Sequence, residues 1–209
     1  LLLVYGASGT GKSSIINCGL ANQLAETDWL PVNVRRGGDI SKSMLNQLLK
    51  QTAANIELNT NDSDEALHAN LRQVVNNVFL DHFKPIYLIF DQFEELFIFG
   101  YKEEWLRFIQ AIRYLMDTDL DVHFIFVIRG EYLEFLSEFE EIIPEFFDNR
   151  VRIEKMTRAM ARESISGPSK LFSINLDENF EENLLKKLSP DKTQIELTFL
   201  QVILDKIYR

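Results

Sequence analysis

The sequence predicts an α/β fold with a central parallel sheet, followed by a small all-helical segment. Three observations support this prediction. Continuous apolar runs at residues 86–90 and 122–128 have the composition of strands buried on both faces. Amphipathic stretches with helical spacing separate the runs. A glycine-rich turn joins the first apolar run to the first helix, the usual start of a nucleotide-binding α/β domain. We therefore expect a core over 1–155 and a helical lid over 156–209.

The elements follow in order along the chain. The expected strands are Leu1–Tyr5, Trp29–Val34, Ile86–Phe90, Val122–Ile128 and the edge strand Val151–Ile153. The expected helices of the core are Ser14–Leu20, Ile40–Ile56, a helix capped by Asp62 and Glu65 that buries Leu67 to Phe79, Glu103–Met116 and Glu131–Phe139. In the lid, helices are expected at Met160–Ile165, Phe180–Leu188 and Ile195–Tyr208, separated by Gly167-Pro168-Ser169 and Ser189-Pro190-Asp191.

The turn Gly6–Ser13 reads Gly-Ala-Ser-Gly-Thr-Gly-Lys-Ser and matches G-x-x-x-x-G-K-[ST] at every fixed position. Its glycines let the backbone close around an anion, and the backbone N–H groups and the helix N-terminus then face a phosphate. We expect Lys12 to reach the β- and γ-phosphates and the Ser13 hydroxyl to ligate Mg²⁺. The expected nucleotide-binding residues are Gly6, Ser8, Gly9, Thr10, Gly11, Lys12, Ser13 and Ser14.

An acidic cluster follows the most apolar strand. Asp91 comes directly after residues 86–90, and Glu94 and Glu95 lie three and four positions later. Ligand groups gather at the carboxyl ends of parallel strands, so we expect Asp91 to hold the magnesium shell. Either Glu94 or Glu95 is a candidate general base for an attacking water. The alternative is a set of solvated acids on a loop.

Several arginines follow the strands. Arg129 ends the fourth apolar run and is a candidate sensor of the γ-phosphate that also stabilises transferred charge. A structural salt bridge from Arg129 to Asp91 or Glu94 is the competing interpretation. The pair Arg35-Arg36 follows the second strand, where phosphate contact and simple solvation are about equally favoured. Arg150, and more weakly Arg152, are candidates for a finger that acts across a subunit interface.

Composition narrows the function classes. The net charge of -10 disfavours a protein that binds nucleic acid or anionic membranes over its whole surface. The single cysteine, Cys18, excludes an internal disulfide framework, suits a reducing, cytoplasmic compartment and is expected to be a small core residue. No apolar run approaches the roughly 20 residues of a membrane span, and no signal peptide precedes the first strand. The chain opens directly on a core strand, so we expect a domain of a longer protein.

Three segments together resemble one known family. These are the phosphate loop, Asp-Gln-Phe-Glu-Glu-Leu-Phe at 91–97, and Phe-Val-Ile-Arg-Gly-Glu-Tyr-Leu at 126–133. In order and spacing the chain resembles the novel-STAND branch of the STAND P-loop NTPases, relatives of NACHT and NB-ARC domains in the AAA+-like group. Gly167-Pro168 and Leu197–Leu204 are similar to the lid segments of that family.

The resemblance implies an ASCE-type P-loop fold, a three-layer αβα sandwich with parallel strand order 5-1-4-3-2 and a helical lid. It implies ATP or ADP with Mg²⁺ as cofactors, and slow hydrolysis coupled to a switch between closed and open oligomeric states, with a homo-oligomer formed on activation. It places such domains between an effector and a repeat-built sensor, in signalling or bacterial antiphage defence. Residue by residue, it assigns Lys12 and Ser13 to the phosphate loop, Asp91 with Glu94 and Glu95 to the extended Walker B motif, and Arg129 to the sensor-one position.

One segment departs from the family pattern. Related lids often contact adenine through a proline, but Glu196–Leu200 contains none. Pro168, in the segment that is similar to the family's lid, is the lid residue that the resemblance assigns to the nucleotide site.

Other functions remain open from the sequence. A GTPase of the Ras type requires Asn-Lys-x-Asp or a near variant, which the chain lacks. A small-molecule kinase shares the loop and the lid, but its lid is usually rich in arginine. A binding-only module and an AAA+-type remodeller are the remaining alternatives. In all of these the expected partner is a nucleotide, with no membrane and no direct nucleic acid.

Overall fold

The protein is described by a computed structural model that covers residues 1–177, 179–189 and 194–208. Its main sheet has five strands in the order β2-β3-β4-β1-β5. The strands are β1 (Leu2–Gly6), β2 (Leu30–Val34), β3 (Ile86–Phe90), β4 (Val122–Arg129) and β5 (Arg150–Arg152). The predicted parallel order 5-1-4-3-2 is therefore confirmed.

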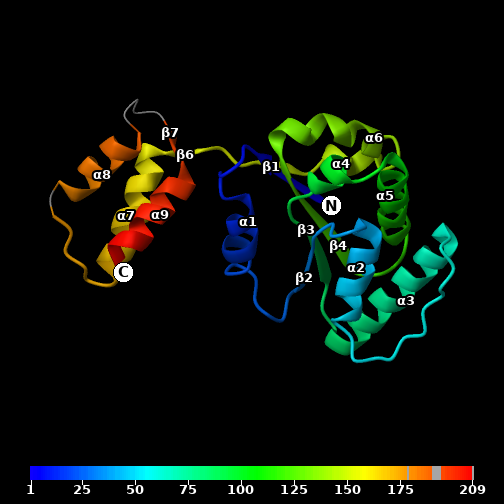
Figure 1. Cartoon of the computed structure of the whole chain (residues 1–209). Helices are drawn as coiled ribbons and strands as arrows, with labels where there is room; N and C mark the ends of the chain where they lie inside the picture. Colours follow the sequence, from blue (N-terminus) through cyan, green and yellow to red (C-terminus); the bar gives the residue numbers. More distant parts are fainter. Residues whose placement is uncertain (178, 190–193, 209) are drawn as a thin grey trace. The chain divides into compact units, whose positions relative to one another are not determined.

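The helices of the core lie on both sides of this sheet. They are α1 (Lys12–Ser14), which continues as the π-helix η1 (Ile15–Leu20), then α2 (Ile40–Leu49), α3 (Asp64–His82), α4 (Glu95–Phe99), α5 (Lys102–Met116) and α6 (Ser137–Glu140), with 3-10 turns η2 (Gly130–Leu136) and η3 (Pro144–Phe147). In Figure 1, α2, α3 and α5 lie on one side of the sheet and α1 on the other. The fold is thus the three-layer α/β class that the sequence predicts.

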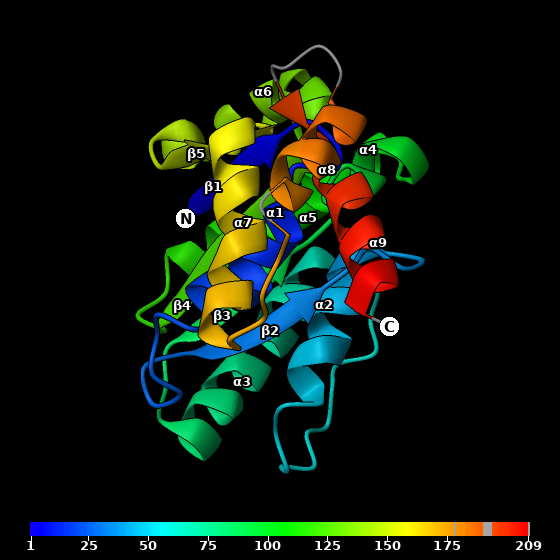
Figure 2. The ribbon, with the colours of Figure 1, turned by 90° about the vertical axis from the view of Figure 1, so that its left-hand side faces the viewer.

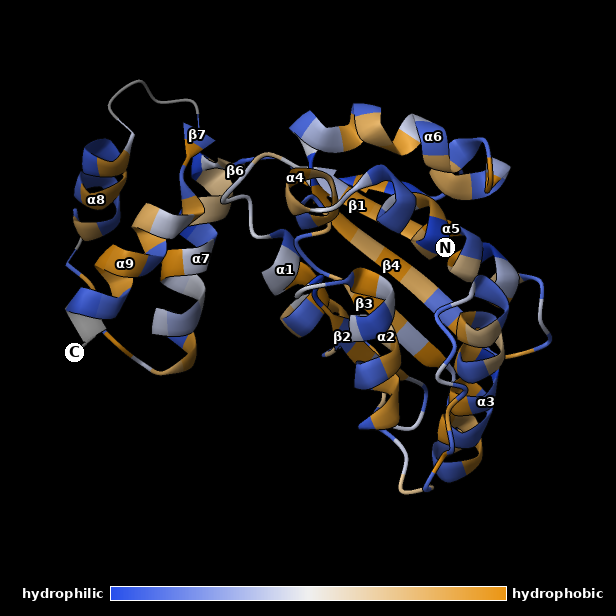
Figure 3. Cartoon of the chain, turned by 45° about the vertical axis from the view of Figure 1, so that its right-hand side comes forward, coloured by the Kyte–Doolittle hydropathy of each residue, from blue (hydrophilic) through white to orange (hydrophobic). Residues whose placement is uncertain are grey.

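The apolar runs are explained by burial of both faces of the sheet. Leu88 and Phe90 of β3 belong to the large core cluster, which also contains residues of α2, α3 and α5. Ile89 lies between them in sequence and is not part of that cluster, but it is buried to the same extent. Successive strand residues face opposite sides, so both faces of β3 are covered. Figure 3 shows the resulting hydrophobic colour along β4.

The chain divides into two compact units. One comprises Leu1–Tyr5 and Ser13–Arg152, and the other comprises Gly6–Lys12 and Ile153–Arg209. The second unit contains α7 (Arg158–Leu171), α8 (Phe180–Leu188), α9 (Leu197–Tyr208) and a small antiparallel sheet of β6 (Met156–Thr157) and β7 (Gln194–Ile195). Its helices pack side by side around Ile165, Leu185 and Leu200 (Figure 2). The domain limits 1–155 and 156–209 remain a prediction.

Two expected helices of the core have different limits. The predicted helix Ile40–Ile56 ends as α2 at Leu49, because the next segment bonds to α3 instead. There Thr52 Oγ1 and Ala53 N donate to Asp81 Oδ2 at 2.6 and 3.1 Å. The cap of α3 is Ser63, whose Oγ accepts from Ala66 N at 3.2 Å. The predicted Asp62–Glu65 box is therefore wrong, since Asp62 instead pairs with Arg107.

Two further expectations are corrected. Gly167-Pro168-Ser169 does not end a helix but lies inside α7, where Ser169 Oγ donates to Ile165 O at 2.9 Å. Pro168 removes one backbone bond, but the helix continues because Ile165 and Ser169 are buried in the core of this unit. Cys18, expected in the core, is exposed on η1. The predicted break at Pro190-Asp191 lies outside the described residues.

Candidate functional site

The phosphate loop has the backbone that its glycines permit. Gly9 and Gly11 have φ of 74° and 87°, in the left-handed region that other residues rarely adopt. At Gly6, a Cβ would lie 2.1 Å from the carbonyl oxygen of Ile153, so only glycine fits this close approach. The side chains of Thr10 and Lys12 then fold back onto the loop.

Those two side chains bind the carbonyl groups of the loop itself. Thr10 Oγ1 donates to Ala7 O at 3.0 Å. Lys12 Nζ donates to Gly6 O and Ala7 O at 2.9 and 2.8 Å. The ammonium group is thus held over the loop, where a phosphate would be a stronger acceptor than neutral carbonyls. Ser8 and Ser14 are exposed.

Residues 196–198 contact the glycines of the loop within the second unit. Thr198 Oγ1 and Glu196 Oε2 lie 3.5 and 3.6 Å from the position of a Cβ on Gly9. Leu197 Cδ2 lies 2.7 Å from that position on Gly11. Glu196 also pairs with Lys155, which offsets its negative charge beside an anion-binding loop.

Ser13 and Asp91 form the centre of the candidate metal site. Ser13 Oγ donates to Asp91 Oδ1 at 2.7 Å, although 78 positions separate the two residues. Gln92 N donates to the same oxygen at 3.0 Å. Asp91 is 9% exposed. A hydroxyl and a carboxylate in contact are the oxygen groups that Mg²⁺ binds beside nucleotide phosphates, so these residues fit that ion.

Glu94 and Arg129 are paired. Arg129 Nε lies 2.9 Å from Glu94 Oε1, and Arg129 N donates to Glu94 Oε2 at 3.2 Å. Both carboxylate oxygens are therefore engaged, and Glu94 is only 5% exposed. Glu95 is half-buried at the start of α4, and no interaction of its carboxylate is found within the described residues.

Aromatic packing fixes this acidic segment. Phe93 stands 4.8 Å from Phe126, centroid to centroid, and its N–H donates to Val127 O at 2.9 Å. Phe97 stands 5.0 Å from Trp105, whose indole nitrogen donates to Leu96 O at 2.8 Å. The sequence-based prediction assigned roles only to the acidic residues of this stretch and missed the role of its apolar residues. Their spacing at 93, 96 and 97 was the available signal.

Backbone strain also marks the segment. Gln92 has φ of 58°, a left-handed conformation that costs a non-glycine residue free energy. The packing of Phe93 on one side and the bond from Gln92 N to Asp91 on the other hold it there. The turn thereby places Asp91 and Glu94 on a fixed backbone.

The remaining arginines separate into two groups. Arg35 Nη2 lies 3.6 Å from Asp91 Oδ2, a contact that the sequence did not predict. The parallel register pairs Val34 with Phe90, so Arg35 and Asp91 are the residues that follow a matched pair. Arg150 and Arg152 lie exposed on β5, and their role as a finger stays a prediction. Pro168 lies in α7, away from any bond with the loop in the described residues.

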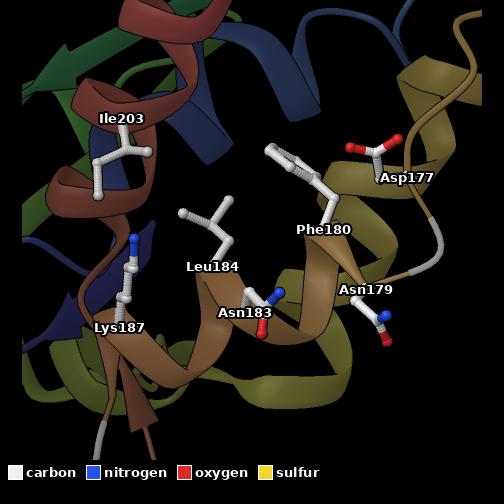
Figure 4. A pocket seen from close by; sticks show the side chains of 7 residues that line it. All are labelled: Asp177, Asn179, Phe180, Asn183, Leu184, Lys187 and Ile203. Atoms are coloured by element: carbon white, nitrogen blue, oxygen red, sulfur yellow. The ribbon is translucent and has the colours of Figure 1, made fainter.

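A separate hollow of about 620 Å³ lies on α8 and α9. Phe180 and Leu184 point into it from α8, and Ile203 faces them from α9 (Figure 4). Asp177 and Lys187 add charge at its rim. None of the predicted site residues lines it.

Two further features are absent from the described residues. They contain no group of three or more His, Cys, Asp or Glu side chains placed to hold a metal ion. No helix among them has the length and apolar character needed to cross a bilayer.

Solved structures share the fold. A Walker-type ATPase of Pyrococcus abyssi aligns with a TM-score of 0.56 at 13% identity, over 92% of this chain and 59% of that chain. The Aeropyrum pernix ORC2 protein in its ADP form aligns with a TM-score of 0.66 at 13% identity, over 91% of this chain and 52% of that chain. The structure of Drosophila ORC bound to DNA aligns with a TM-score of 0.57 at 15% identity, over 91% of this chain and 50% of that chain. The chain thus spans between 50% and 59% of the length of these three proteins, and at such identities the likeness shows the fold alone.

The sequence comparison is more specific. No protein of curated function matches the sequence significantly. The family described as Novel STAND NTPase 1 matches residues 1–209, the whole chain. This match agrees with the phosphate loop, the Ser13–Asp91 contact and the strand order described above. The chain therefore belongs to the Novel STAND NTPase 1 family.

Proposed function

We propose that this chain is an ATP-binding module that hydrolyses ATP slowly and acts as a switch. The observation that carries the proposal is the hydrogen bond from Ser13 to Asp91. It joins the last residue of the phosphate loop to the acid that follows β3, the two groups that P-loop NTPases use for Mg²⁺. The membership of the family supports an NTPase module.

The loop residues would bind the nucleotide. Backbone N–H groups of Gly9 to Ser13 would surround the β-phosphate, and Lys12 would exchange the carbonyls of Gly6 and Ala7 for phosphate oxygens. Ser13 and Asp91 would hold Mg²⁺, which neutralises charge on the phosphates. ADP or ATP would occupy the site in alternation.

For hydrolysis, we assign different roles to the two glutamates. Glu94 is a positioning residue, because both of its oxygens hold Arg129. Arg129 would act on the γ-phosphate from that position. Glu95, half-buried and not paired within the described residues, would be the base that activates water.

Binding and phosphate release of wild type, Lys12→Ala, Glu94→Gln and Glu95→Gln test these assignments. Lys12→Ala should weaken ATP binding at least about tenfold, since it removes a charge-assisted phosphate contact. Glu95→Gln should bind ATP as the wild type does but release phosphate on the order of a hundredfold more slowly. Normal ATP binding by Lys12→Ala would overturn the proposal.

A binding-only module is the second candidate. The engagement of both Glu94 oxygens by Arg129 favours it, because that carboxylate is not available to a water in this state. ADP that binds but never exchanges, with no phosphate release by the wild type, would establish this function. An AAA+-type remodeller would instead require a finger such as Arg150 from a second subunit.

We further propose that nucleotide state controls assembly into a homo-oligomer within a larger protein that carries effector and repeat sensor domains. A role in bacterial signalling or antiphage defence, in the cytoplasm, is part of this proposal, and the single cysteine suits that compartment. The net charge of -10 supports the absence of direct nucleic-acid binding. Mass measured by light scattering with and without a non-hydrolysable ATP analogue tests assembly, and an unchanged mass would contradict it.

A further inference from the structure

Arg35 occupies the outer side of the Asp91 carboxylate. Its Nη2 atom lies 3.6 Å from Oδ2, while Ser13 Oγ lies 2.7 Å from the other oxygen, Oδ1. The side chain of Arg35 is 63% exposed and that of Asp91 is 10% exposed. A largely solvated cation therefore stands beside the group that would hold the metal.

The neighbouring Arg36 has an entirely different environment. Its Nη2 lies 2.7 Å from Glu104 Oε2, with both side chains at 10% exposure or less, and it also donates to Gly37 O and Gly38 O. Glu104 in turn accepts from Ile40 N at 3.0 Å. The ion pair of Arg36 with Glu104 thus connects the segment after β2 to α5. Of the two adjacent arginines, Arg35 is therefore the one available to a ligand.

The position of Arg35 follows from the sheet. Val34 pairs with Phe90 in parallel register, so the next residue on each strand, Arg35 and Asp91, emerges at the same carboxyl edge. Ligands of open parallel sheets bind at this edge. The ion pair with Asp91 is weak, because Arg35 is solvated and 3.6 Å is long for a charged hydrogen bond. Little free energy holds the guanidinium on Asp91.

Metal binding at Asp91 would weaken the ion pair between Arg35 and Asp91. A divalent cation and a guanidinium repel each other at such short range, so Mg²⁺ at Ser13 and Asp91 disfavours Arg35 in its present position. If Ser13 and Asp91 held Mg²⁺ beside a bound triphosphate, the γ-phosphate would add a new anion at the same edge of the sheet. A planar guanidinium binds phosphate oxygens in pairs.

We propose that Arg35 contacts the γ-phosphate of bound ATP and lets the site distinguish ATP from ADP. Without nucleotide, Arg35 neutralises Asp91. With Mg·ATP, whose Mg²⁺ Ser13 and Asp91 would hold, Arg35 would leave Asp91 and contact the terminal phosphate, which ADP lacks. The proposal rests on the proposed ATP-binding function and adds a specificity-determining residue to it.

The test compares dissociation constants for Mg²⁺ with a non-hydrolysable ATP analogue and for Mg²⁺ with ADP. The proteins are wild type, Arg35→Ala, Arg35→Lys and, as a matched control, Arg72→Ala, an exposed arginine on α3. Arg35→Ala should weaken the analogue about tenfold, which is ~1.4 kcal/mol, and change ADP binding less than about twofold. The affinity of Arg35→Lys for the analogue should lie between those of the wild type and Arg35→Ala, since lysine keeps the positive charge but loses the planar guanidinium. Arg72→Ala should match the wild type for both nucleotides.

The outcomes separate this inference from the function on which it rests. Equal weakening of both nucleotides by Arg35→Ala, or no weakening of either, would overturn the role of Arg35 while ATP binding by the wild type stands. Failure of the wild type to bind either nucleotide would overturn both the role of Arg35 and the proposed ATP-binding function. A thermal unfolding curve for Arg35→Ala should coincide with that of the wild type, because the side chain is mostly solvated.

Discussion

At the scale of the residue, Asp91 is held by groups from three parts of the chain. Ser13 is the last residue of the phosphate loop, Gln92 is the residue after Asp91, and Arg35 follows a neighbouring strand. The left-handed turn at Gln92 sets the backbone N–H that donates to Asp91. The candidate metal site is therefore arranged before any ligand arrives.

A second residue, His68, gives the protein a pH-dependent stability. Burial lowers the pKa of His68, which stacks on Tyr114 with centroids 4.5 Å apart, and Arg107 lowers it further. Asp64 and Glu65 act in the opposite direction but do not cancel the shift. A depressed pKa in the folded state means that the neutral ring favours folding above the unfolded value near 6.5, and that this contribution is lost as the pH falls through the folded value.

Urea unfolding at pH 7 and pH 5 checks this effect. His68→Gln should lose less stability than the wild type between the two pH values, because glutamine does not titrate. Identical pH dependence in His68→Gln and the wild type would refute the assignment.

Individual site residues differed in how far the sequence could predict them. Lys12, Ser13 and Asp91 follow from a motif and a strand end, because their roles depend on local spacing. The pairing of Arg129 with Glu94 was one of two alternatives, since strand order alone leaves the side-chain rotamers open. Arg35 could be placed only once the register of β2 with β3 was known.

At the scale of the element, apolar periodicity predicted strands better than helix ends. The limits of β3 and α8 agree with those expected, because each is bounded by a proline or a clear change in pattern. α2 ends early because of a long-range bond to Asp81, and α7 continues through Pro168 because Ile165 and Ser169 on either side of the proline are buried. Such tertiary contacts override local signals and are not visible in the sequence.

The phosphate loop gives the most direct prediction for an element. Gly11→Ala should abolish high-affinity ATP binding and destabilise the fold by roughly 1–3 kcal/mol. The reason is that Gly11 has φ of 87° and that a Cβ there would lie 2.7 Å from Leu197 Cδ2. Calorimetric titration and thermal unfolding would measure the two effects.

Gly19→Ala is the matched control for this change. A Cβ at Gly19 would make an ordinary 3.8 Å contact with Ile15, and the residue lies in η1 without positive φ. The same chemical change should therefore leave binding intact and stabilise the protein by about 0.5–1 kcal/mol. Equal effects of the two substitutions would show that the loop conformation is not what binding requires.

At the scale of the whole molecule, the fold class and family were accessible from the sequence because order and spacing of three segments extend over the chain. The strand order and the family match agree with that expectation. The division into two units was less accessible, since residues 6–12 group with 153–209 rather than with the strand that precedes them. Contacts of the loop with Ile153, Leu197 and Thr198 account for this grouping.

The central claim is that Ser13 and Asp91 hold Mg²⁺ for a bound triphosphate. The most direct measurement is calorimetric titration of a non-hydrolysable ATP analogue with Mg²⁺ and with EDTA, for wild type, Ser13→Ala and Asp91→Asn. We predict that Mg²⁺ tightens binding by the wild type at least about tenfold, ~1.4 kcal/mol, and that both variants lose most of this gain. Equal affinity of the wild type in Mg²⁺ and EDTA, or an undiminished gain in both variants, would contradict the account.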